Sequence, residues 1–448
     1  MSTVVYGFSP RGGGFSLYNR TTDQLEAFFN SPTSDNWLFS NSIHSAFSDK
    51  QGNLWLSTHT HGLEKVVFDK SFFTTIQISQ KKYPKTANEV RAVLEDSQSN
   101  IWVSTKDRKL SVFNKNKVKI GELNANGNIG QDNLIPATAY CIIEDKEKNI
   151  WIGTKRAGIF RLKKTQNPLK FDVTQYKNIP SDVYSLSDNS VYSIFQDKQG
   201  RMWVGTYGGG LNLIENISGK TRFISHRNHL ENYPIESAAQ VRFVAQTKQG
   251  NICLGTTGGM LMFAPDFSSP ETVKFKKYSL EPNKRHSITN NDVHGFCITK
   301  KGEMFIFTFG GGINKVTGVD KQGFPTTFKS YTSVDGLPSD VTLGIIEDEF
   351  GKLWISTENS LTRFDPETGT FKTFSEIRKI MTNSYFSEVS ACKLRNNDII
   401  FGYADELLLF SPREMIGNNF KPYIALTNFQ IYNKDVPVGE KSPLKTKY

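Results

Sequence analysis

Apolar and polar residues follow one another in a fixed order along this chain, and the order recurs eight times. Each copy has an apolar run, an Asp-x-x-Gly segment, an aromatic and β-branched run, a Gly-rich or polar loop and a second apolar run. The clearest copy, residues 197–211, reads Asp-Lys-Gln-Gly-Arg-Met-Trp-Val-Gly-Thr-Tyr-Gly-Gly-Gly-Leu. One marker position is occupied in turn by Trp55, Trp102, Trp151, Trp203, Cys253, Phe305, Trp354 and Ile400. The resulting period of 46 to 52 residues, with strand-like content, predicts the blades of a β-propeller.

Each repeat predicts four short strands. Residues 191–195 form the first, and the Asp-x-x-Gly that follows supplies a tight turn, because Asp accepts hydrogen bonds from nearby amides and Gly tolerates positive φ. The second strand is the marker run Met202–Thr206, the third begins at Leu211, and residues 223–224 belong to the fourth. A blade of four antiparallel strands cannot bury both faces alone, so the repeats are expected to stack around an axis.

The ends of the repeat array predict how the ring closes. No fourth strand follows residues 407–410 of the last copy, and an unpaired blade would expose a sheet edge. We expect residues 72–78 to supply the missing strand, which gives an all-β, seven-bladed propeller of four-stranded antiparallel blades at residues 71–415. Residues 1–70 then represent the last one or two blades of a preceding, partial propeller. Residues 416–448 begin another β module.

Composition adds few constraints. The net charge of +10 is compatible with a polyanionic partner, but Lys and Arg are spread along the chain, which favours solubility over nucleic-acid binding. The four Cys stand in apolar or small-residue columns of the repeat and are expected to be core residues, not metal ligands or disulfides. We find no apolar run of about 20 residues and no signal-peptide pattern, so the location of the chain itself stays open.

The phrase Asp-x-x-Gly-x-(Leu/Ile/Met)-Trp-(Ile/Val/Leu)-(Gly/Ser)-Thr-x-x-Gly-Gly-Leu resembles the two-component regulator propeller repeat. That repeat builds the periplasmic sensor region of hybrid two-component histidine kinases in Bacteroides-type gut bacteria. Residues 422–432 resemble the start of the Ig-like Y_Y_Y domain of those sensors, so residues 416–448 are expected to be a truncated Ig-like segment. The resemblance implies a non-catalytic, oligosaccharide-sensing region that is periplasmic in the parent protein and acts in a homodimer with the rest of the kinase. The kinase core and membrane span are not in this sequence.

Candidate ligand-binding residues lie in the loops that vary between copies. The loop after the second strand and the connection after the fourth share one end of the ring, whereas the nearly constant Asp-x-x-Gly turns occupy the other. Variable loops on a rigid scaffold are where recognition usually resides, and aromatic faces with Arg, Asn and Asp suit a sugar, acidic or sulfated given the positive charge. The candidates are Lys106, Asp107, Arg108, Lys155, Arg156, Tyr207, Phe309, Arg285, His286 and Asn291. For any single one, a solvated loop position is the competing interpretation.

Other functions stay open at this stage. Several propellers are glycosidases or lyases, and a fold alone does not decide function, although no catalytic residue is singled out here. A protein-interaction scaffold and a non-functional, truncated sensor fragment are further alternatives. His59 and His61 could be two metal ligands, but no third ligand stands at a telling spacing. Neither a metal nor a cofactor is therefore expected.

Overall fold

The computed structural model describes residues 4–8, 12–19, 23–30, 40–49, 53–59, 61–66, 72–78, 88–282, 287–374, 376–381, 385–404, 406–415, 430–432, 434–437 and 439. The chain divides into two compact units, Met1–Phe72 and Phe73–Tyr448.

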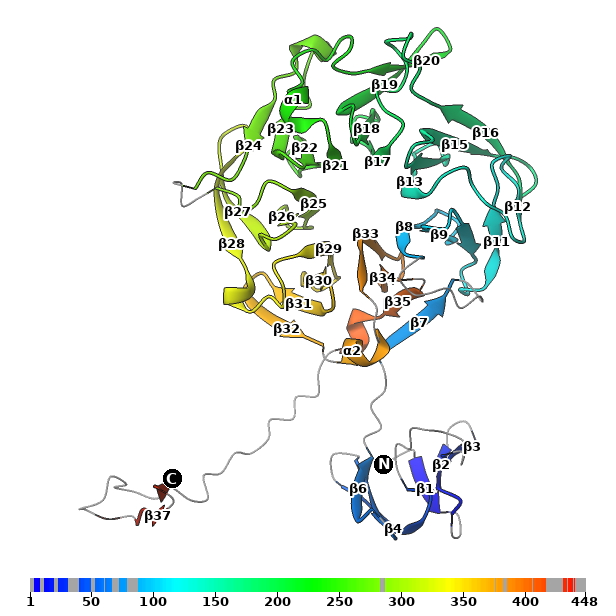
Figure 1. Ribbon diagram of the computed structural model, residues 1–448, viewed down its shortest axis with the longest axis vertical. Helices are drawn as coiled ribbons and strands as arrows, with labels where there is room; N and C mark the ends of the chain where they lie inside the picture. The colour runs from blue at the N-terminus through cyan, green and yellow to red at the C-terminus, as the bar shows by residue number, and fades with distance from the viewer. Residues whose placement is uncertain are drawn as a thin grey trace. The chain divides into compact units, whose positions relative to one another are not determined.

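Within the described residues of the larger unit, seven antiparallel sheets stand around a central axis (Figure 1). The first blade contains β8 (Val90–Glu95), β9 (Ile101–Thr105), β10 (Leu110–Phe113), β11 (Lys119–Leu123) and the short β12 (Ile129–Gly130). The second contains β13 (Ala139–Glu144), β14 (Ile150–Thr154), β15 (Ile159–Lys164) and β16 (Phe171–Tyr176). The third contains β17 (Val191–Gln196), β18 (Met202–Thr206), β19 (Leu211–Ile217) and β20 (Lys220–Ile224).

The remaining blades continue around the ring. The fourth contains β21 (Val241–Gln246), β22 (Ile252–Thr256), β23 (Gly259–Phe263) and β24 (Lys276–Tyr278), and the fifth contains β25 (Val293–Ile298), β26 (Met304–Thr308), β27 (Ile313–Val319) and β28 (Pro325–Tyr331). The sixth contains β29 (Thr342–Glu347), β30 (Leu353–Thr357), β31 (Leu361–Asp365) and β32 (Thr370–Thr373). The seventh contains β33 (Phe386–Lys393), β34 (Ile399–Tyr403), β35 (Glu406–Phe410) and β7 (Phe73–Gln77). Short helices lie in the connections, namely α1 (Ile235–Ala238), α2 (Glu376–Ile380), η1 (Pro270–Thr272), η2 (Ser333–Asp335) and η3 (Pro412–Met415).

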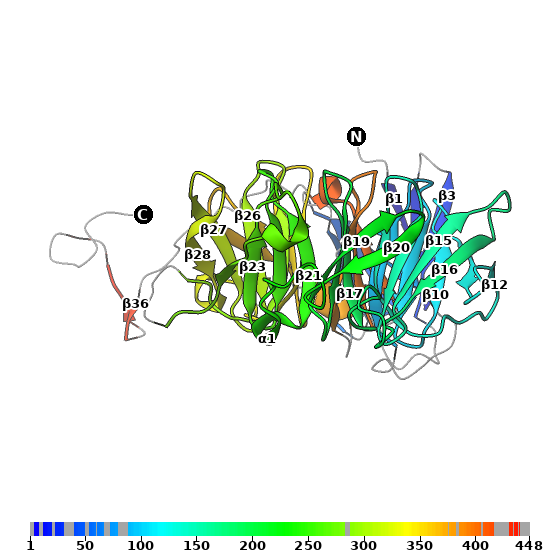
Figure 2. The same ribbon diagram turned by 90° about the horizontal axis from the view of Figure 1, so that it is seen from above.

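The ring closes as the sequence predicts. Strand β7 pairs antiparallel with β35, and Phe73 lies opposite Phe410 in this register. The Phe73 ring also packs edge-on against Phe374 at 5.8 Å and Phe410 at 5.3 Å. The innermost strands contact one another in succession, and β33 of the last blade contacts β8 of the first. Figure 2 shows the ring from its edge, with strands running between its two faces. A strand from upstream of the ring therefore completes the seventh blade.

The turn Asp and the marker Trp form one unit. Asp197 accepts hydrogen bonds from Arg201 N at 2.8 Å through Oδ1 and from Trp203 Nε1 at 3.0 Å through Oδ2. The same Trp–Asp bond recurs as Trp55–Asp49, Trp102–Asp96, Trp151–Asp145 and Trp354–Asp348. The repeats whose marker is not Trp have Thr247, Thr299 and Leu394 in place of the Asp. The turn alone was expected to account for the Asp, and its bond to the Trp was not predicted.

The marker residues also pack between blades. Trp203 is fully buried, and its ring contacts Phe263 of the next blade edge-on at 5.1 Å. Gly205 follows two residues later in β18, where an added Cβ would lie 2.5 Å from Val241 of the adjacent inner strand. Only a residue without a side chain fits at this distance. The four Cys form no disulfide, and two of them, Cys253 and Cys297, are buried.

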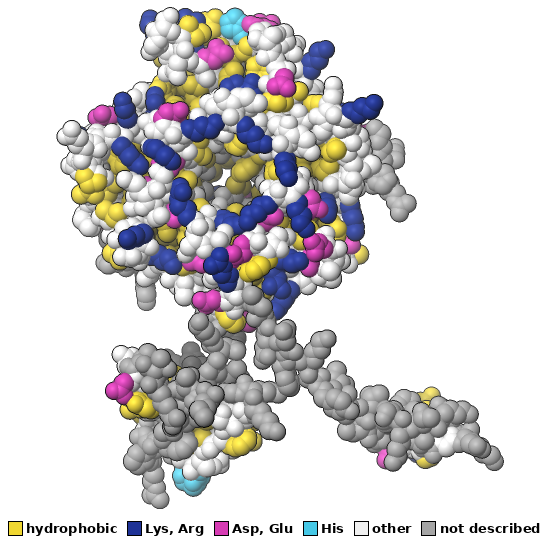
Figure 3. Space-filling model, turned by 180° about the vertical axis from the view of Figure 1, so that it is seen from behind, with side chains coloured by type: hydrophobic (Ala, Val, Ile, Leu, Met, Phe, Trp, Pro, Cys, Tyr) yellow, Lys and Arg dark blue, Asp and Glu magenta, His cyan; other side chains and the backbone are white. Residues whose placement is uncertain are grey.

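The turns after the inner strands link neighbouring blades. Lys198 N donates a hydrogen bond to Gln246 Oε1 at 2.9 Å, and Lys198 Nζ donates to Lys248 O at 3.0 Å. Arg395 N donates to Glu95 Oε2 at 2.6 Å, which joins the last blade to the first. Figure 3 views the molecule from behind and shows Lys and Arg side chains around the opening of the ring. Part of the positive charge therefore holds the blades together.

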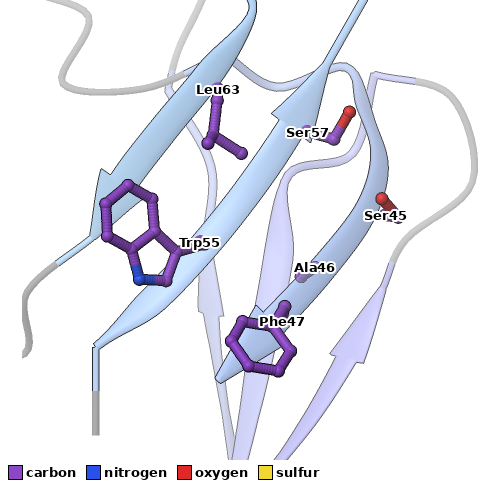
Figure 4. A pocket seen from close by; sticks show the side chains of 6 residues that line it. All are labelled: Ser45, Ala46, Phe47, Trp55, Ser57 and Leu63. Carbon is purple, nitrogen blue, oxygen red and sulfur yellow. The ribbon is translucent and has the colours of Figure 1, made fainter. Parts of the chain in front are cut away.

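The smaller unit contains two three-stranded antiparallel sheets among its described residues. One consists of β1 (Val4–Phe8), β2 (Phe15–Asn19) and β3 (Gln24–Phe28), and the other of β4 (Ile43–Ser48), β5 (Leu54–Thr58) and β6 (Leu63–Val66). Phe47, Trp55 and Leu63 line a shallow pocket on one face of the second sheet (Figure 4). Phe47 and Leu63 are each 66% exposed. The interpretation of residues 1–70 as part of a preceding propeller stays a prediction.

Only the last part of the C-terminal segment falls within the described residues. A two-stranded hairpin joins β36 (Gln430–Ile431) to β37 (Lys434–Asp435). Residues 416–429, which include most of the segment that resembles an Ig-like domain, lie outside the described residues. The Ig-like interpretation therefore stays a prediction.

Candidate functional site at the channel mouth

A β-bulge recurs at the same position in the inner strands of six blades. In β17, Val191 pairs with Thr206 and Ser193 pairs with Gly205, so Tyr192 is the extra residue between them. A bulge of this kind leaves its extra residue out of the ladder and redirects the side chain. Register shifts at the same place in the first six blades leave out Arg91, Tyr140, Tyr192, Arg242, His294 and Leu343.

Five of these extra residues, all except Leu343, line one pocket. It is lined by Arg91, Tyr140, Tyr192, Arg242, His294, Glu388 and Val389. Glu388 and Val389 come from β33, where the register shift between Phe386 and Ala391 spans four residues instead of one. We refer to the six residues Arg91, Tyr140, Tyr192, Arg242, His294 and Glu388 as the channel-mouth cluster.

Aromatic rings connect two arginines along one side of the pocket. The Arg91 guanidinium lies 5.3 Å from the centre of the Tyr140 ring, and Tyr140 lies 4.5 Å from Tyr192. Tyr192 stacks on Tyr207 at 4.5 Å, and Arg242 lies 5.6 Å from the centre of the Tyr207 ring. Cation–π contacts of this length hold each guanidinium beside a ring face. The result is an arc of three tyrosines with a cation at each end.

A carboxylate, that of Asp292, holds the Arg242 guanidinium in place. Arg242 donates to Asp292 through Nε at 2.6 Å and through Nη2 at 3.0 Å. Burial opposes ionisation of Asp292, but His294 and the Arg242 guanidinium outweigh it, so the pKa of this carboxyl lies below its usual range. His294 itself stacks on Phe309, with ring centres 5.2 Å apart. The bidentate pair keeps Arg242 in one orientation.

Glu89 anchors the other arginine. Its carboxylate accepts hydrogen bonds from Arg91, from Tyr385 and, at 2.6 Å, from Lys106. Burial raises the pKa of Glu89, yet the bonds from Lys106 and Tyr385 and the charge of Arg91 bring it below the usual value. The hydrogen bond that Tyr385 donates to Glu89 raises the pKa of Tyr385 to about 12. Glu89 is therefore an anion that holds Arg91 in place.

The structure brings four of the predicted ligand-binding residues to this cluster. Tyr207 belongs to the aromatic arc, Phe309 covers His294, and Lys106 is bonded to Glu89. Lys155 Nζ lies 5.6 Å from the centre of the Tyr140 ring. Their role in binding stays a prediction, because their positions alone do not test it.

The other six predicted residues lie elsewhere. Arg108 and Arg156 are exposed and have positive φ values of 67° and 78°. Asp107 and Asn291 accept hydrogen bonds from backbone amides in the loops around them. The last two, Arg285 and His286, lie outside the described residues.

None of the channel-mouth cluster is among the residues predicted from the loops. Five of its six residues occupy the second position of an inner strand, as in Val191-Tyr192-Ser193, and Glu388 occupies the third position of β33. The available signal was a column that holds Arg, Tyr or His in five repeats, after an apolar residue in each and before a small residue in all but one of them. Polar and aromatic side chains are uncommon beside a column of buried residues. They occur here because the bulge takes them out of the regular strand.

Comparison with known proteins agrees with the fold. The sequence profile of the two-component regulator propeller matches residues 38–60, 84–107, 133–156 and 185–208. The chain therefore carries two-component regulator propeller repeats. It is 24% identical over 329 residues to histidine kinase P4 of Formosa agariphila, and the match covers 63% of this chain and 23% of that protein.

Solved structures show the same architecture. The extracellular domains of two putative hybrid two-component systems from B. thetaiotaomicron superpose with TM-scores of 0.60 and 0.58, at 20% and 19% identity. They cover 98% and 95% of this chain, which spans 65% and 54% of their length. A virginiamycin B lyase from Staphylococcus aureus matches 76% of this chain and 99% of its own at a TM-score of 0.54 and 13% identity. At these identities the likeness establishes the fold alone.

The chain spans about a quarter of the histidine kinase that it matches. Among the residues that the structure describes, no helix is both long and apolar enough to cross a bilayer. Within the same residues, no group of three His, Cys, Asp or Glu side chains forms a possible metal site.

Proposed function

We propose that this chain is the ligand-sensing propeller region of a hybrid two-component sensor, and that it binds an oligosaccharide at the channel mouth. The regulator propeller repeats, and the likeness to extracellular domains of such systems, support the sensing role. The observation that carries the ligand proposal is the arc of Tyr140, Tyr192 and Tyr207 between two arginines. Flat aromatic faces with a few fixed polar groups are typical of small-ligand sites.

Signalling requires the rest of the histidine kinase under this proposal, and the propeller is non-catalytic. Residues 71–415 form the sensing ring, residues 1–70 belong to a preceding propeller, and residues 416–448 start an Ig-like domain. The parent protein is periplasmic and homodimeric. Ligand binding would act on the equilibrium between two packings of these domains, and only by as much as the ligand prefers one of them.

Titration of the full chain against a panel of plant, host and fungal oligosaccharides tests the proposal. We expect saturable heat for at least one glycan, a loss of about tenfold in affinity in Tyr192→Ala, because stacking on the arc is removed, and no change in Tyr432→Ala. Tyr432 is 95% exposed and serves as the matched control. Mass spectrometry of the recovered glycan separates sensing from catalysis. Cleavage products, or binding that Tyr192→Ala leaves intact, would refute the proposal.

A further inference from the structure

Glu388 places a carboxylate between the two arginines of the channel mouth. Its Oε2 atom lies 3.9 Å from Arg91 Nη1 and 4.0 Å from Arg242 Nη1. The three side chains come from β33, β8 and β21, so three blades meet at this oxygen. Both distances exceed the roughly 2.7–2.9 Å of a charge-assisted hydrogen bond. The position therefore attracts an anion, but the protein's own carboxylate fills it loosely.

A strained segment holds this carboxylate in place. Val389 has a φ of 51°, and a β-branched residue in that region is an outlier that carries backbone strain. The strain lies in the four-residue bulge of β33, whereas the inner strands of the other six blades carry a bulge of one residue within the described chain. Strain of this kind persists where the surrounding structure enforces it, and it clusters at ligand sites and switches.

Two residues that line the same pocket carry unpartnered polar atoms. His294 is 1% exposed, and neither of its ring nitrogens has a hydrogen-bond partner among the described residues. Its Nε2 atom lies 3.8 Å from Asp292 Oδ2. Arg91 Nε is also buried without a partner among those residues. A buried polar group left without a partner destabilises the folded state, and a ligand oxygen bonded to it would remove that cost.

We propose that the space between Arg91 and Arg242 binds the anionic group of a sugar, a carboxylate or a sulfate ester, and that Glu388 occupies it when the ligand is absent. The two Nη1 atoms take the anionic oxygens, and the sugar ring lies on the tyrosine arc. The Glu388 carboxylate leaves the site when the ligand enters, since two anions cannot share it. The sugar part of this inference rests on the proposed function, whereas the anion site does not.

The test is calorimetric titration of the full chain with D-glucuronate, glucose 6-sulfate, glucose and inorganic sulfate. Glu388→Gln keeps the size of the side chain and removes the competing charge. We expect it to tighten binding of both charged sugars by about tenfold, as is ordinary for removing one like charge from a partly buried site, and to leave glucose unchanged. Glu367→Gln, a change at a 66% exposed side chain outside the cluster, is the matched control. Arg91→Gln should weaken both charged sugars by about tenfold.

Each result bears on one of the two proposals separately. Equal affinity for glucose and glucuronate, or an effect of Glu388→Gln no larger than that of Glu367→Gln, would overturn the anion site. Neutral oligosaccharides that bind in a Tyr192-dependent manner would then leave the proposed function standing. Conversely, inorganic sulfate that binds in an Arg91-dependent manner, with no sugar bound, would support the anion site and defeat the saccharide proposal. Arg91→Lys, which keeps the positive charge beside Glu89, should retain most of the binding and so distinguishes loss of charge from a folding defect in Arg91→Gln.

Discussion

The bond between the turn Asp and the marker Trp is expected to be one of the strongest local contributions to blade stability. Trp203 is fully buried, and Asp197 is 1% exposed. Asp197 also accepts a bond from Arg201 Nε at 2.7 Å. Without the carboxylate, the indole N–H loses its partner inside the blade. The perturbation that isolates this bond is Asp197→Thr, because two other blades already use Thr at this position.

Thr retains the turn while it removes the indole partner. In the fourth blade, Thr247 Oγ1 accepts a hydrogen bond from Asn251 N at 3.1 Å, and in the fifth, Thr299 Oγ1 accepts one from Glu303 N at 3.0 Å. These are the counterparts of the Arg201 N bond to Asp197. The cost of Asp197→Thr is therefore that of an orphaned buried donor and a lost charge-assisted bond, about 2–3 kcal/mol in total.

A double-mutant cycle with Trp203→Phe separates this cost from packing. Phe occupies the marker position naturally in the fifth blade at Phe305, beside Thr299. In the Phe background no indole N–H remains to be orphaned, so Asp197→Thr should cost less than about 1 kcal/mol there. The coupling energy between the two positions is then about 2 kcal/mol, well above the few tenths expected for independent sites.

Equilibrium urea unfolding of the four proteins measures the cycle. Circular dichroism is the appropriate probe, because Trp203→Phe removes a fluorophore. The m-values should agree within error across the set, so that the midpoints report stability and not a change in the unfolded state. Additive effects, with a coupling below about 0.5 kcal/mol, would refute the reasoning and reduce the Trp–Asp pairing to a by-product of packing.

Three further outcomes follow from the contacts of the larger unit. Phe73→Ala, at a 4% exposed side chain, should lower the free energy of unfolding by about 3 kcal/mol. Phe72→Ala, at a 40% exposed side chain, should change it by less than about 0.5 kcal/mol. If urea unfolding shows no larger effect for Phe73→Ala than for Phe72→Ala, burial of Phe73 in the closing strand does not stabilise the ring. Since the folded-state pKa of Tyr385 is raised from 10.0 to about 12, stability is lost as the pH rises through that window, and Tyr385→Phe should flatten this loss in unfolding curves recorded at pH 10 and 12. Burial raises the pKa of the Cys141 and Cys297 thiols to about 12, so thiol reagents at neutral pH should label them only after denaturation, and rapid labelling of the native chain would contradict their placement.

The repeat made most of the fold predictable from the sequence. A period near fifty residues dictates the blade, and a missing fourth strand in the last copy dictates that another segment must pair with Leu407, which β7 does at Ile76. Both follow from local pattern and from the cost of an open sheet edge. The bond between Asp197 and Trp203 was equally encoded, because Asp disappears from the repeats that lack Trp. It was missed because a turn already explained the Asp.

The site was harder to predict, since a bulge changes which residues face the channel. Alternation along β17 places Val191 and Ser193 on the same side of the sheet, and a regular strand would send Tyr192 to the other. The register shift instead removes Tyr192 from the ladder. Loop residues such as Arg108 have variable sequences for a simpler reason, namely exposure to solvent. Variable residues in a loop thus indicate exposure to solvent, whereas variable polar residues beside a buried column indicate a bulge that brings them into the channel-mouth pocket.

The cluster also suggests why sensing would suit this blade arrangement. Glu388 belongs to the blade that contains β7, the first strand of the larger unit, so the chain passes from the smaller unit directly into the blade that carries the strained bulge. Arg91 and Arg242 stand on two other blades and are fixed by Glu89 and Asp292. A ligand that replaces Glu388 would leave those anchors unchanged and release strain only in the seventh blade. The binding energy would then be delivered to the one blade that is completed by a distant segment, and not distributed evenly around the ring.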